Sequence, residues 1–351
     1  MERSKRWGFK VEPDFSLYKR RSKGGGVTSA DSVLGDFLGR EIPGLVEFKP
    51  RGESFRYVFP LEFRRRYGSF SGEWVCTRIG SGGFSTVYLC CLRDYRVALK
   101  VPRGFESLIE AYARGVTPSG PVISERDMDA LLREIEVASA LEHPHLLKLL
   151  AYHVDRGGRG MFLVYEYATH GSLKYQLEER SLTSTRDILV LAIQLADALR
   201  YLHTHGIIHG DVKPSNILFV NRVAKLGDYS TAIRTLDTRK QKIPPGTPGW
   251  RAPEQVDREL GEEAVRRGYQ HKVDVYQLGN LILYSLTGEN IDGEKLLENE
   301  DALEKATGKL GDQLGKLIEK TMSKNPWERP SLEGVIGELI NIYSSKLNTY
   351  T

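Results

Sequence analysis

The sequence His-Gly-Asp-Val-Lys-Pro-Ser-Asn occupies residues 209–216, after a strongly amphipathic stretch at residues 187–203. A second motif, Asp-Tyr-Ser at residues 228–230, follows a short apolar segment. Two carboxylates, a carboxamide and a lysine therefore lie close together in the sequence. A polar turn after a helix is the alternative interpretation, and the rest of the sequence decides between the two.

The side chains of these motifs match what the transfer of a phosphoryl group requires. Such a reaction needs a carboxylate near the attacking hydroxyl, oxygen ligands for Mg²⁺, and cations that balance charge on the phosphoryl oxygens. Asp211 would accept or orient the hydroxyl proton, and Lys213 would lie against the transferred phosphate. Asn216 and Asp228 would bind Mg²⁺, which prefers hard oxygen ligands.

A glycine-rich turn upstream supports the same chemistry; its residues are Gly80, Ser81, Gly82, Gly83, Phe84 and Ser85. It joins two predicted strands, whereas a dinucleotide fingerprint joins a strand to a helix. Glycines let the backbone approach phosphate oxygens, and an aromatic residue at the tip can cover them. Alone, the turn fits a structural hairpin equally well. Lys100 lies on the predicted strand at residues 96–101, the second strand after the turn, and would direct its ammonium group at the same phosphates.

The order of predicted elements indicates an α+β protein with two lobes. A small β-rich N-lobe, about residues 73–167, has strand patterns at 74–79, 86–92, 96–101, 146–153 and 161–167 and a helix at 126–141. A larger helical C-lobe, about residues 171–345, has helical patterns at 187–203, 273–287, 313–322 and 332–343. Residues 1–72 form a basic N-terminal extension whose role the sequence does not reveal.

Composition narrows the functional class. The chain has 351 residues, 40% of them hydrophobic, and no apolar run approaches the ~20 residues of a membrane-spanning helix. The net charge of +4 does not indicate nucleic-acid binding. The three cysteines, Cys76, Cys90 and Cys91, show no CxxC spacing, so buried small side chains are expected rather than redox or metal work. We expect a cytoplasmic protein without a membrane anchor.

From about residue 74 to residue 343 the chain resembles the eukaryotic-type Ser/Thr protein kinases, with the catalytic motifs in the family's order. The resemblance implies a bilobal protein-kinase-like fold. It also implies transfer of the γ-phosphoryl group of Mg-ATP to protein hydroxyls, with ATP and Mg²⁺ as the only cofactors. Lys213 and Thr247 match the Ser/Thr branch of the family rather than its tyrosine branch.

By this resemblance, further residues acquire roles in binding the nucleotide. Lys100 holds the α- and β-phosphates, and Glu134 on the following helix pairs with it. The backbone of Glu166 and Ala168, in the segment that connects the lobes, hydrogen-bonds adenine. The apolar residues that sandwich the adenine ring correspond to Val87, Ala98 and Leu218.

The resemblance also implies a platform for an extended peptide. Residues 246–254, Gly-Thr-Pro-Gly-Trp-Arg-Ala-Pro-Glu, resemble the substrate-facing end of the family's activation segment. Glu254 would pair with Arg329, and Asp274 would brace the catalytic loop. Small-molecule kinases, such as aminoglycoside phosphotransferases, and the RIO kinases share the His-Gly-Asp motif but lack this platform. A catalytically inactive scaffold would have lost Lys100, Asp211 or Asp228, which are all present.

Three positions depart from the family pattern. Ser85 replaces the third glycine of the phosphate loop, and Tyr229-Ser230 follows Asp228 where Phe-Gly is usual. The usual arginine before Asp211 is Gly210, so a phosphorylated activation loop would lack that cation. We therefore expect the loop to be ordered without phosphate, although autophosphorylation at Thr231, Thr235 or Thr238 is possible. A loop-rich insertion at residues 109–124 could be surface decoration or a regulatory contact.

Overall fold

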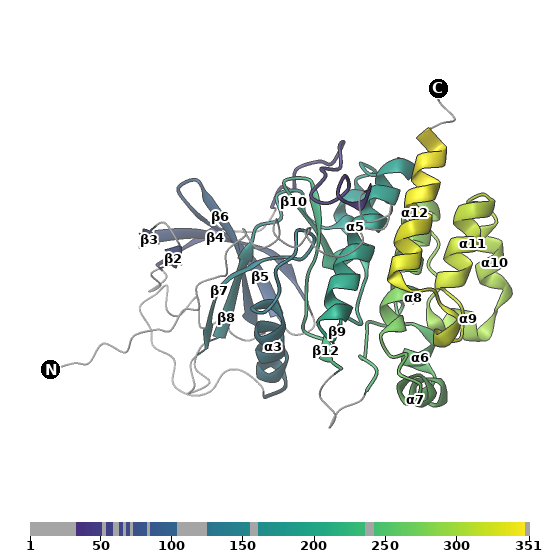
Figure 1. Ribbon diagram of the computed structural model, residues 1–351. Helices are drawn as coiled ribbons and strands as arrows, with labels where there is room; N and C mark the ends of the chain where they lie inside the picture. The colour runs from purple at the N-terminus through teal and green to yellow at the C-terminus, as the bar shows by residue number, and fades with distance from the viewer. Residues whose placement is uncertain are drawn as a thin grey trace, which may run out of the picture. The chain divides into compact units, whose positions relative to one another are not determined.

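The structure is a computed structural model that describes residues 33–50, 54–58, 63–65, 68–70, 73–82, 85–103, 125–154, 161–235 and 242–347 (Figure 1). These residues fall into two compact units. The sheet unit comprises the described parts of residues 49–139 and 148–167, and the helical unit comprises residues 33–48, 140–147 and the described parts of 168–347. The predicted α+β architecture with two lobes is confirmed. The basic arm before residue 33 and the insertion at 109–124 lie outside the described residues.

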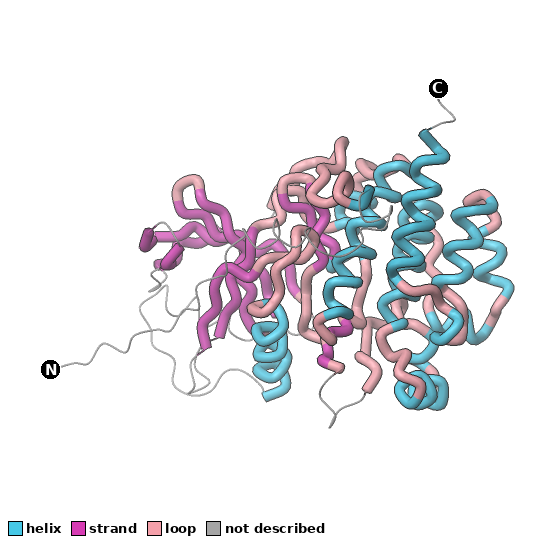
Figure 2. The backbone as a smooth tube through the Cα atoms, viewed as in Figure 1, coloured by secondary structure: helices cyan, strands magenta, loops and turns pink. Residues whose placement is uncertain are grey.

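The sheet unit is built on one antiparallel sheet of six strands in the order β1-β4-β5-β6-β8-β7 (Figure 2). The elements of this unit are β1 (Ser54–Val58), β2 (Phe63–Arg65), β3 (Gly68–Phe70), β4 (Glu73–Ser81), β5 (Ser85–Leu92), β6 (Tyr95–Pro102), α3 (Glu125–Ala138), β7 (Leu149–Val154) and β8 (Met161–Glu166). Strands β4 to β6 are the predicted meander. Strand β1 overlaps a stretch, residues 55–63, whose alternation also predicts a strand, and it extends the sheet through its pairing with β4.

The two faces of this sheet carry different side chains, because neighbouring residues of a strand point to opposite faces. Val87 pairs with Lys100, and Ala98 pairs with Tyr165, so these four side chains share one face. The opposite face carries the buried core, formed by Trp74, Cys76, Tyr88, Cys90, Leu99, Val101, Phe162 and Val164. The strand alternation therefore separates Lys100 from the apolar core of the unit.

Two of the three cysteines are joined. Cys76 on β4 lies directly opposite Cys90 on β5, with 4.1 Å between their Cα atoms, and the two form a disulfide in the core. The prediction of small buried side chains holds for their burial, but the prediction of no redox chemistry is wrong for this pair. The strand register makes them neighbours, which their separation in sequence does not show. Cys91 is free and half-buried, and burial raises the pKa of its thiol.

The helical unit contains the predicted long helices and several short elements. They are α4 (Leu173–Glu178), α5 (Thr185–Thr204), β9 (Ile207–Ile208), η2 (Pro214–Asn216), β10 (Ile217–Val220), β11 (Val223–Leu226), β12 (Ile233–Arg234), α6 (Pro253–Val256), α7 (Arg258–Arg266), α8 (Lys272–Thr287), α9 (Gly293–Glu298), α10 (Asp301–Thr307), α11 (Asp312–Thr321), η3 (Pro326–Glu328) and α12 (Leu332–Leu347). In the described part of the chain, no helix is long and apolar enough to cross a membrane.

Helices α5 and α8 form the centre of the helical unit. Ser184 caps α5, since its hydroxyl accepts the Asp187 N–H, and Gly288 ends α8 in the left-handed conformation that glycine adopts readily. Both helices are buried along most of their length. Helix α5 packs against α8 and α12, and α12 lies beside it in Figure 1. The catalytic-loop motif follows α5 directly, so this packing fixes where the motif begins.

A segment of the N-terminal extension, residues 33–48, packs onto the helical unit. Its buried apolar side chains are Leu34, Phe37, Ile42 and Leu45. The Phe37 ring meets Tyr343 of α12 edge-on, with ring centroids 5.0 Å apart. The buried Gln194 side chain of α5 donates to the carbonyls of Phe37 and Arg40 at 2.9 and 2.8 Å. This part of the extension is therefore an integral layer of the helical unit.

The buried His145 connects residues 33–48 to strand β11 of the helical unit. The Gly39 N–H donates to Nε2 of His145 at 3.0 Å, and Nδ1 of His145 contacts the Ala224 carbonyl at 2.8 Å. One ring nitrogen thus accepts while the other donates, which requires the neutral imidazole. Burial lowers the pKa of His145 to about 4 and keeps that form at neutral pH.

Replacement of Phe37 by alanine should lower the free energy of unfolding by about 3 kcal/mol, because it leaves a cavity beside Tyr343. Urea denaturation followed by circular dichroism measures the effect. The control is Val46→Ala in the same segment, at a side chain that is 40% exposed, and its effect should stay below about 0.5 kcal/mol. Equal, small effects of the two substitutions would contradict the packing of this segment.

Candidate active site

Lys100 on β6 and Glu134 on α3 form a close ion pair in the sheet unit. The lysine Nζ donates to both carboxylate oxygens, at 2.8 and 2.7 Å. Glu134 is 1% exposed, and the Lys100 side chain is 12% exposed. Because a buried carboxylate is costly without partners, the pair holds both side chains in place. The structure brings together the two residues that the family resemblance paired.

Tyr165 on β8 adds a third member to this pair. Its hydroxyl donates to Oε1 of Glu134 at 2.7 Å, and it reaches the carboxylate from the same sheet face as Lys100. The sequence alone does not indicate a role for Tyr165 in orienting Glu134. The signal that could have found it is the pairing of Ala98 with Tyr165, which depends on the sheet register.

The glycine-rich turn connects β4 and β5 beside Lys100. Gly80 and Ser81 end β4, and Ser85 begins β5. The Gly82 N–H donates to the carbonyl of the buried Ser85 at 2.7 Å, which narrows the turn. Gly83 and Phe84 lie outside the described residues. The turn is adjacent to the Lys100 face, because Gly80 pairs with Val87 and Val87 pairs with Lys100.

The remaining residues expected to contact adenine occupy both units. Val87 and Ala98 are half-buried on the Lys100 face of the sheet. Glu166 ends β8, and its carboxylate accepts the Lys148 N–H at 2.8 Å. The Glu166 side chain therefore stabilises the backbone just before β7. Ala168 and Leu218 belong to the helical unit and are half-buried. Their contacts with a nucleotide remain a prediction.

The catalytic loop, residues 209–216, is held by one aspartate of α8. Oδ2 of Asp274 accepts the His209 N–H at 3.0 Å, and Oδ1 accepts the Gly210 N–H at 2.7 Å. His203 at the end of α5 contacts Oδ2 at 2.7 Å. Asp274 is fully buried, and burial alone would raise its pKa, but the bonds and charges of His203, His209 and Gly210 outweigh burial and lower it. The carboxylate therefore stays charged and orients the loop.

His209 links the catalytic loop to the residue before the Asp-Tyr-Ser motif. Its Nε2 contacts the Gly227 carbonyl at 3.1 Å, and its Nδ1 accepts the Asp211 N–H at 3.3 Å. The ring is completely buried and packs edge-on against Tyr229. The hydroxyl of Tyr229, which the family's usual phenylalanine lacks, donates to the Leu226 carbonyl at 3.0 Å. The two motifs are thus fixed relative to each other.

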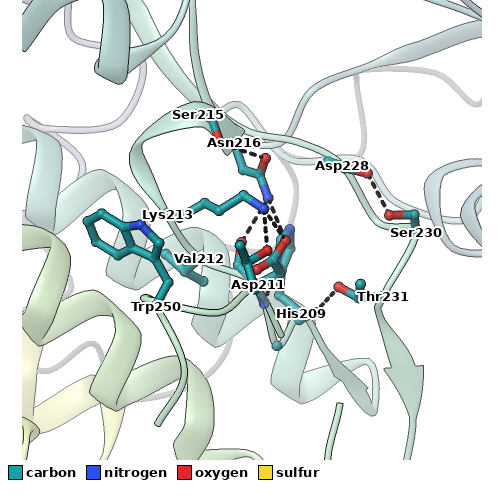
Figure 3. Close-up of polar contacts among 12 residues, drawn as sticks. His209, Asp211, Val212, Lys213, Ser215, Asn216, Asp228, Ser230, Thr231 and Trp250 are labelled. Atoms are coloured by element: carbon teal, nitrogen blue, oxygen red, sulfur yellow. Dashed lines mark hydrogen bonds and ion pairs between the residues drawn. The ribbon is translucent and has the colours of Figure 1, made fainter. Parts of the chain in front are cut away.

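Asp211, Lys213 and Asn216 converge in one polar cluster (Figure 3). Oδ2 of Asp211 accepts from Lys213 Nζ at 2.6 Å and from Asn216 Nδ2 at 3.2 Å. Lys213 also donates to the Thr247 hydroxyl at 2.5 Å. Oδ1 of Asp211 is buried and has no hydrogen-bond partner among the described residues. A buried carboxylate oxygen without a partner is suited to accept a hydrogen bond from a substrate hydroxyl.

Asp228 is presented by an unusual backbone conformation. Its φ of 65° lies in the left-handed region, which costs free energy in a residue other than glycine and is tolerated more readily by aspartate than by most residues. The Ser230 hydroxyl donates to Oδ1 of Asp228 at 2.8 Å (Figure 3). Ser230 stands where the family has glycine. The structure adds a direct contact with the carboxylate.

Glu254 and Arg329 form a fully buried bidentate ion pair. Nη1 donates to Oε1 at 2.6 Å and Nη2 donates to Oε2 at 2.7 Å, and both side chains are 0% exposed. The guanidinium also donates to the carbonyls of Ser323 and Lys272. Because the buried guanidinium and carboxylate are both satisfied by hydrogen bonds, the pair can anchor the end of residues 246–254 to the segment that contains Arg329.

The family model described as the protein kinase domain matches residues 75–339. The chain belongs to the protein kinase family. The predicted family is thereby confirmed, and the buried ion pairs and the polar cluster described above lie within the matched residues.

Several curated kinases are similar to this kinase domain. One is named as a probable serine/threonine-protein kinase of Dictyostelium discoideum, 29% identical over 77% of this chain and 28% of the relative. Another is an Aurora kinase of the same organism, 29% identical over 59% of this chain and 52% of the relative. A salt tolerance receptor-like cytoplasmic kinase of Oryza sativa subsp. japonica is 34% identical over 63% and 58%. The kinase chain thus spans less than two thirds of the length of each.

Replacement of Asp274 by asparagine should lower the free energy of unfolding by about 3 kcal/mol near pH 7, because an amide cannot accept all three hydrogen bonds. The depressed pKa of Asp274 stabilises the folded kinase above the ordinary aspartate pKa, and this contribution is lost as the pH falls through the folded value. The difference between wild type and variant should therefore shrink from about pH 5 to about pH 3.

Urea titrations across this pH range measure the difference for Asp274→Asn. The matched control is Asp301→Asn, at an exposed aspartate in the first turn of α10, which should differ little from wild type at any pH. A difference that stays constant down to about pH 3 would contradict a charged Asp274 as the brace.

Proposed function

We propose that this protein is a Ser/Thr protein kinase that transfers the γ-phosphoryl group of Mg-ATP to protein hydroxyls. The observation that carries the proposal is the cluster in which Lys213 bonds Asp211 and Thr247 at once, with one buried oxygen of Asp211 left for a substrate. The intact Lys100–Glu134 pair and the kinase relatives support it.

The residues proposed to hold Mg²⁺ fit a hard cation. The Asn216 amide nitrogen donates to the carbonyl and to Oδ2 of Asp211. Its oxygen accepts the Ser215 hydroxyl at 3.4 Å and has a second lone pair for a ligand. Ser230 orients the carboxylate of Asp228. An amide oxygen and a carboxylate suit Mg²⁺, which completes its coordination with phosphate oxygens and water. Bound Mg²⁺ would neutralise charge on the phosphates.

Each charged residue then has a role in positioning or proton transfer. Asp211 would accept or orient the proton of the attacking hydroxyl through Oδ1. Lys213, held by Asp211 and Thr247, would stabilise negative charge that develops on the transferred group. Lys100, kept in place by Glu134 and Tyr165, would hold the α- and β-phosphates. Glu166, Ala168 and the apolar residues named above would contact adenine.

A protein substrate is favoured over a small alcohol by residues 246–254. Thr247 contacts the catalytic Lys213, and Glu254 is anchored by Arg329, so both ends of this segment are tied to the helical unit. Small-molecule kinases with a His-Gly-Asp motif lack the segment. An extended peptide that crosses this surface would bring a serine or threonine hydroxyl to Asp211. Protein substrates are therefore part of the proposal, as is autophosphorylation.

We propose a cytoplasmic location on the basis of composition, because the chain has only three cysteines. The relative from Oryza sativa subsp. japonica is also named as a receptor-like cytoplasmic kinase. The Cys76–Cys90 disulfide argues the other way, since such bonds persist mainly in oxidising compartments. Cells are quenched with acid, the protein is denatured and its free thiols are alkylated without a reductant, and mass spectrometry then decides between the two compartments. Alkylated Cys76 and Cys90 fit the cytoplasm, and a bridged pair fits an oxidising compartment.

The substitutions Lys100→Met and Asp228→Ala should each lower kcat at least about a hundredfold in enzyme that circular dichroism shows to be folded, because each removes a group that balances or orients phosphate charge. Incubation with labelled ATP and a generic basic protein measures transfer. The matched controls are Lys174→Met, at a side chain that is 63% exposed, and Asp301→Ala, and both should keep full activity. Substantial transfer by either active-site variant would refute the assignment.

Phosphoamino-acid analysis of the labelled protein should show phosphoserine or phosphothreonine, because Lys213 and Thr247 close the cluster around a small hydroxyl. The control is the Asp211→Asn variant, which should give no label. Predominant phosphotyrosine, or transfer to a small alcohol in preference to protein, would overturn the proposed substrate class.

A further inference from the structure

Gly210 and Pro244 pack directly against each other. Gly210 has a φ of 73°, and a Cβ built on it would lie 2.2 Å from Cβ and 2.5 Å from Cγ of Pro244, which is buried. Real Cβ atoms do not approach other atoms this closely. The ring of Pro244, from the end of the activation segment, therefore occupies the place where a side chain at position 210 would begin.

The side-chain amide of Gln255 on α6 connects the same two segments. Its Nε2 donates to the Gly210 carbonyl at 3.0 Å and to the Pro244 carbonyl at 2.9 Å. Its Oε1 accepts the Ala252 N–H at 2.8 Å. A Cβ at Gly246 would lie 2.6 Å from this Nε2, so the glycine at 246 leaves room for the amide. Gln255 thus bonds the catalytic loop on one side and the activation segment on the other.

Gln277 on α8 completes the connection. It is 0% exposed, and its Oε1 accepts the N–H of Val212, the neighbour of Asp211, at 2.8 Å. Its Nε2 contacts the Gly210 carbonyl, Oε1 of Gln255 and the Trp250 carbonyl at 3.0 to 3.3 Å. The side-chain amides of Gln255 and Gln277 bond to each other, and all their other partners are neutral backbone groups. The connection between the two segments therefore requires neither a phosphate group nor an arginine.

The threonines of the described part of the segment are also engaged. The Thr231 hydroxyl donates to the His209 carbonyl at 3.4 Å, and the Thr235 hydroxyl donates to the Gly206 carbonyl at 3.2 Å. These contacts hold the start of the segment on His209 of the catalytic loop and on Gly206 before it, while Pro244 and Gln255 hold its end. Both anchor points exist in the unphosphorylated chain.

We propose that Gln255 and Gln277 are positioning residues that hold the activation segment on the catalytic loop without phosphorylation, with Pro244 filling the space beside Gly210. The inference rests on the proposed kinase function and names its regulation. Gln277 acts on Asp211 through the Val212 N–H, and Gln255 acts on the peptide platform through Pro244 and Ala252. Loss of Gln277 therefore lowers kcat, and loss of Gln255 raises KM for the protein substrate.

The test uses Gln255→Met and Gln277→Met, because methionine keeps the length of the side chain and removes the hydrogen bonds. Phosphatase-treated enzymes are assayed on an exogenous protein. We expect at least a tenfold loss of kcat for Gln277→Met and at least a tenfold rise in KM for protein for Gln255→Met, with KM for ATP within threefold of wild type. Gln313→Met, at an exposed glutamine of α11, is the matched control and should behave as wild type.

Hydrogen exchange provides a readout that does not depend on activity. The Val212 N–H should exchange faster in Gln277→Met and the Ala252 N–H faster in Gln255→Met, while the Gly210 N–H on Asp274 stays protected. Unchanged exchange together with activity within threefold of wild type overturns the proposal. If the wild type itself transfers no phosphate, the proposed function fails, and the exchange rates still decide whether the two amides hold the segment.

A substitution cycle tests the packing of Pro244. Gly210→Ala should lose at least tenfold in activity, since its Cβ cannot coexist with the proline ring. Pro244→Gly alone should lose less, and the double variant should recover activity relative to Gly210→Ala. Phosphatase treatment of the wild type should change activity by less than threefold. A hundredfold loss on that treatment, about 2.7 kcal/mol of transition-state stabilisation, would show that phosphate orders the segment.

Discussion

The buried carboxylate of Asp274 determines the geometry of the active site more than any other group. It receives two backbone N–H groups of the catalytic loop and the His203 imidazole, so a loop with almost no regular structure acquires a single conformation. Its position depends in turn on α8, which is buried along most of its length. A charge inside a protein is costly unless several donors surround it, and this arrangement supplies them. The placement of Asp211 follows from that of its neighbours in the loop.

The same principle recurs with different partners at the other ion pairs. Glu134 is held by Lys100 and Tyr165, and Glu254 is held by Arg329. Each carboxylate is almost fully buried and satisfied by specific donors, so loss of one partner leaves a charge that water cannot reach. The catalytic geometry therefore relies on a few buried charges rather than on numerous surface contacts, which contribute little individually.

The sequence predicts the residues that carry out the chemistry better than the residues that hold them in position. Asp211, Asn216 and Asp228 are recognisable because their types and order match phosphoryl transfer, and α5 and α8 are recognisable from their apolar periodicity. Tyr165, Gln255 and Gln277 are not, since each acts through a residue far away in the sequence. The Cys76–Cys90 pair depends on strand register, and register depends on the whole sheet.

The packing of residues 33–48 has a practical consequence for work with shorter versions of the protein. Similarity to the kinase family begins at residue 75, but among the described residues buried side chains already occur from Leu34 onward. A recombinant fragment trimmed to the similarity boundary would expose the apolar surface that Phe37 and Ile42 cover on the helical unit. It would also leave the buried amide of Gln194 without its two carbonyl partners. Such a fragment should express poorly and aggregate, and expression boundaries are better chosen from burial than from alignment.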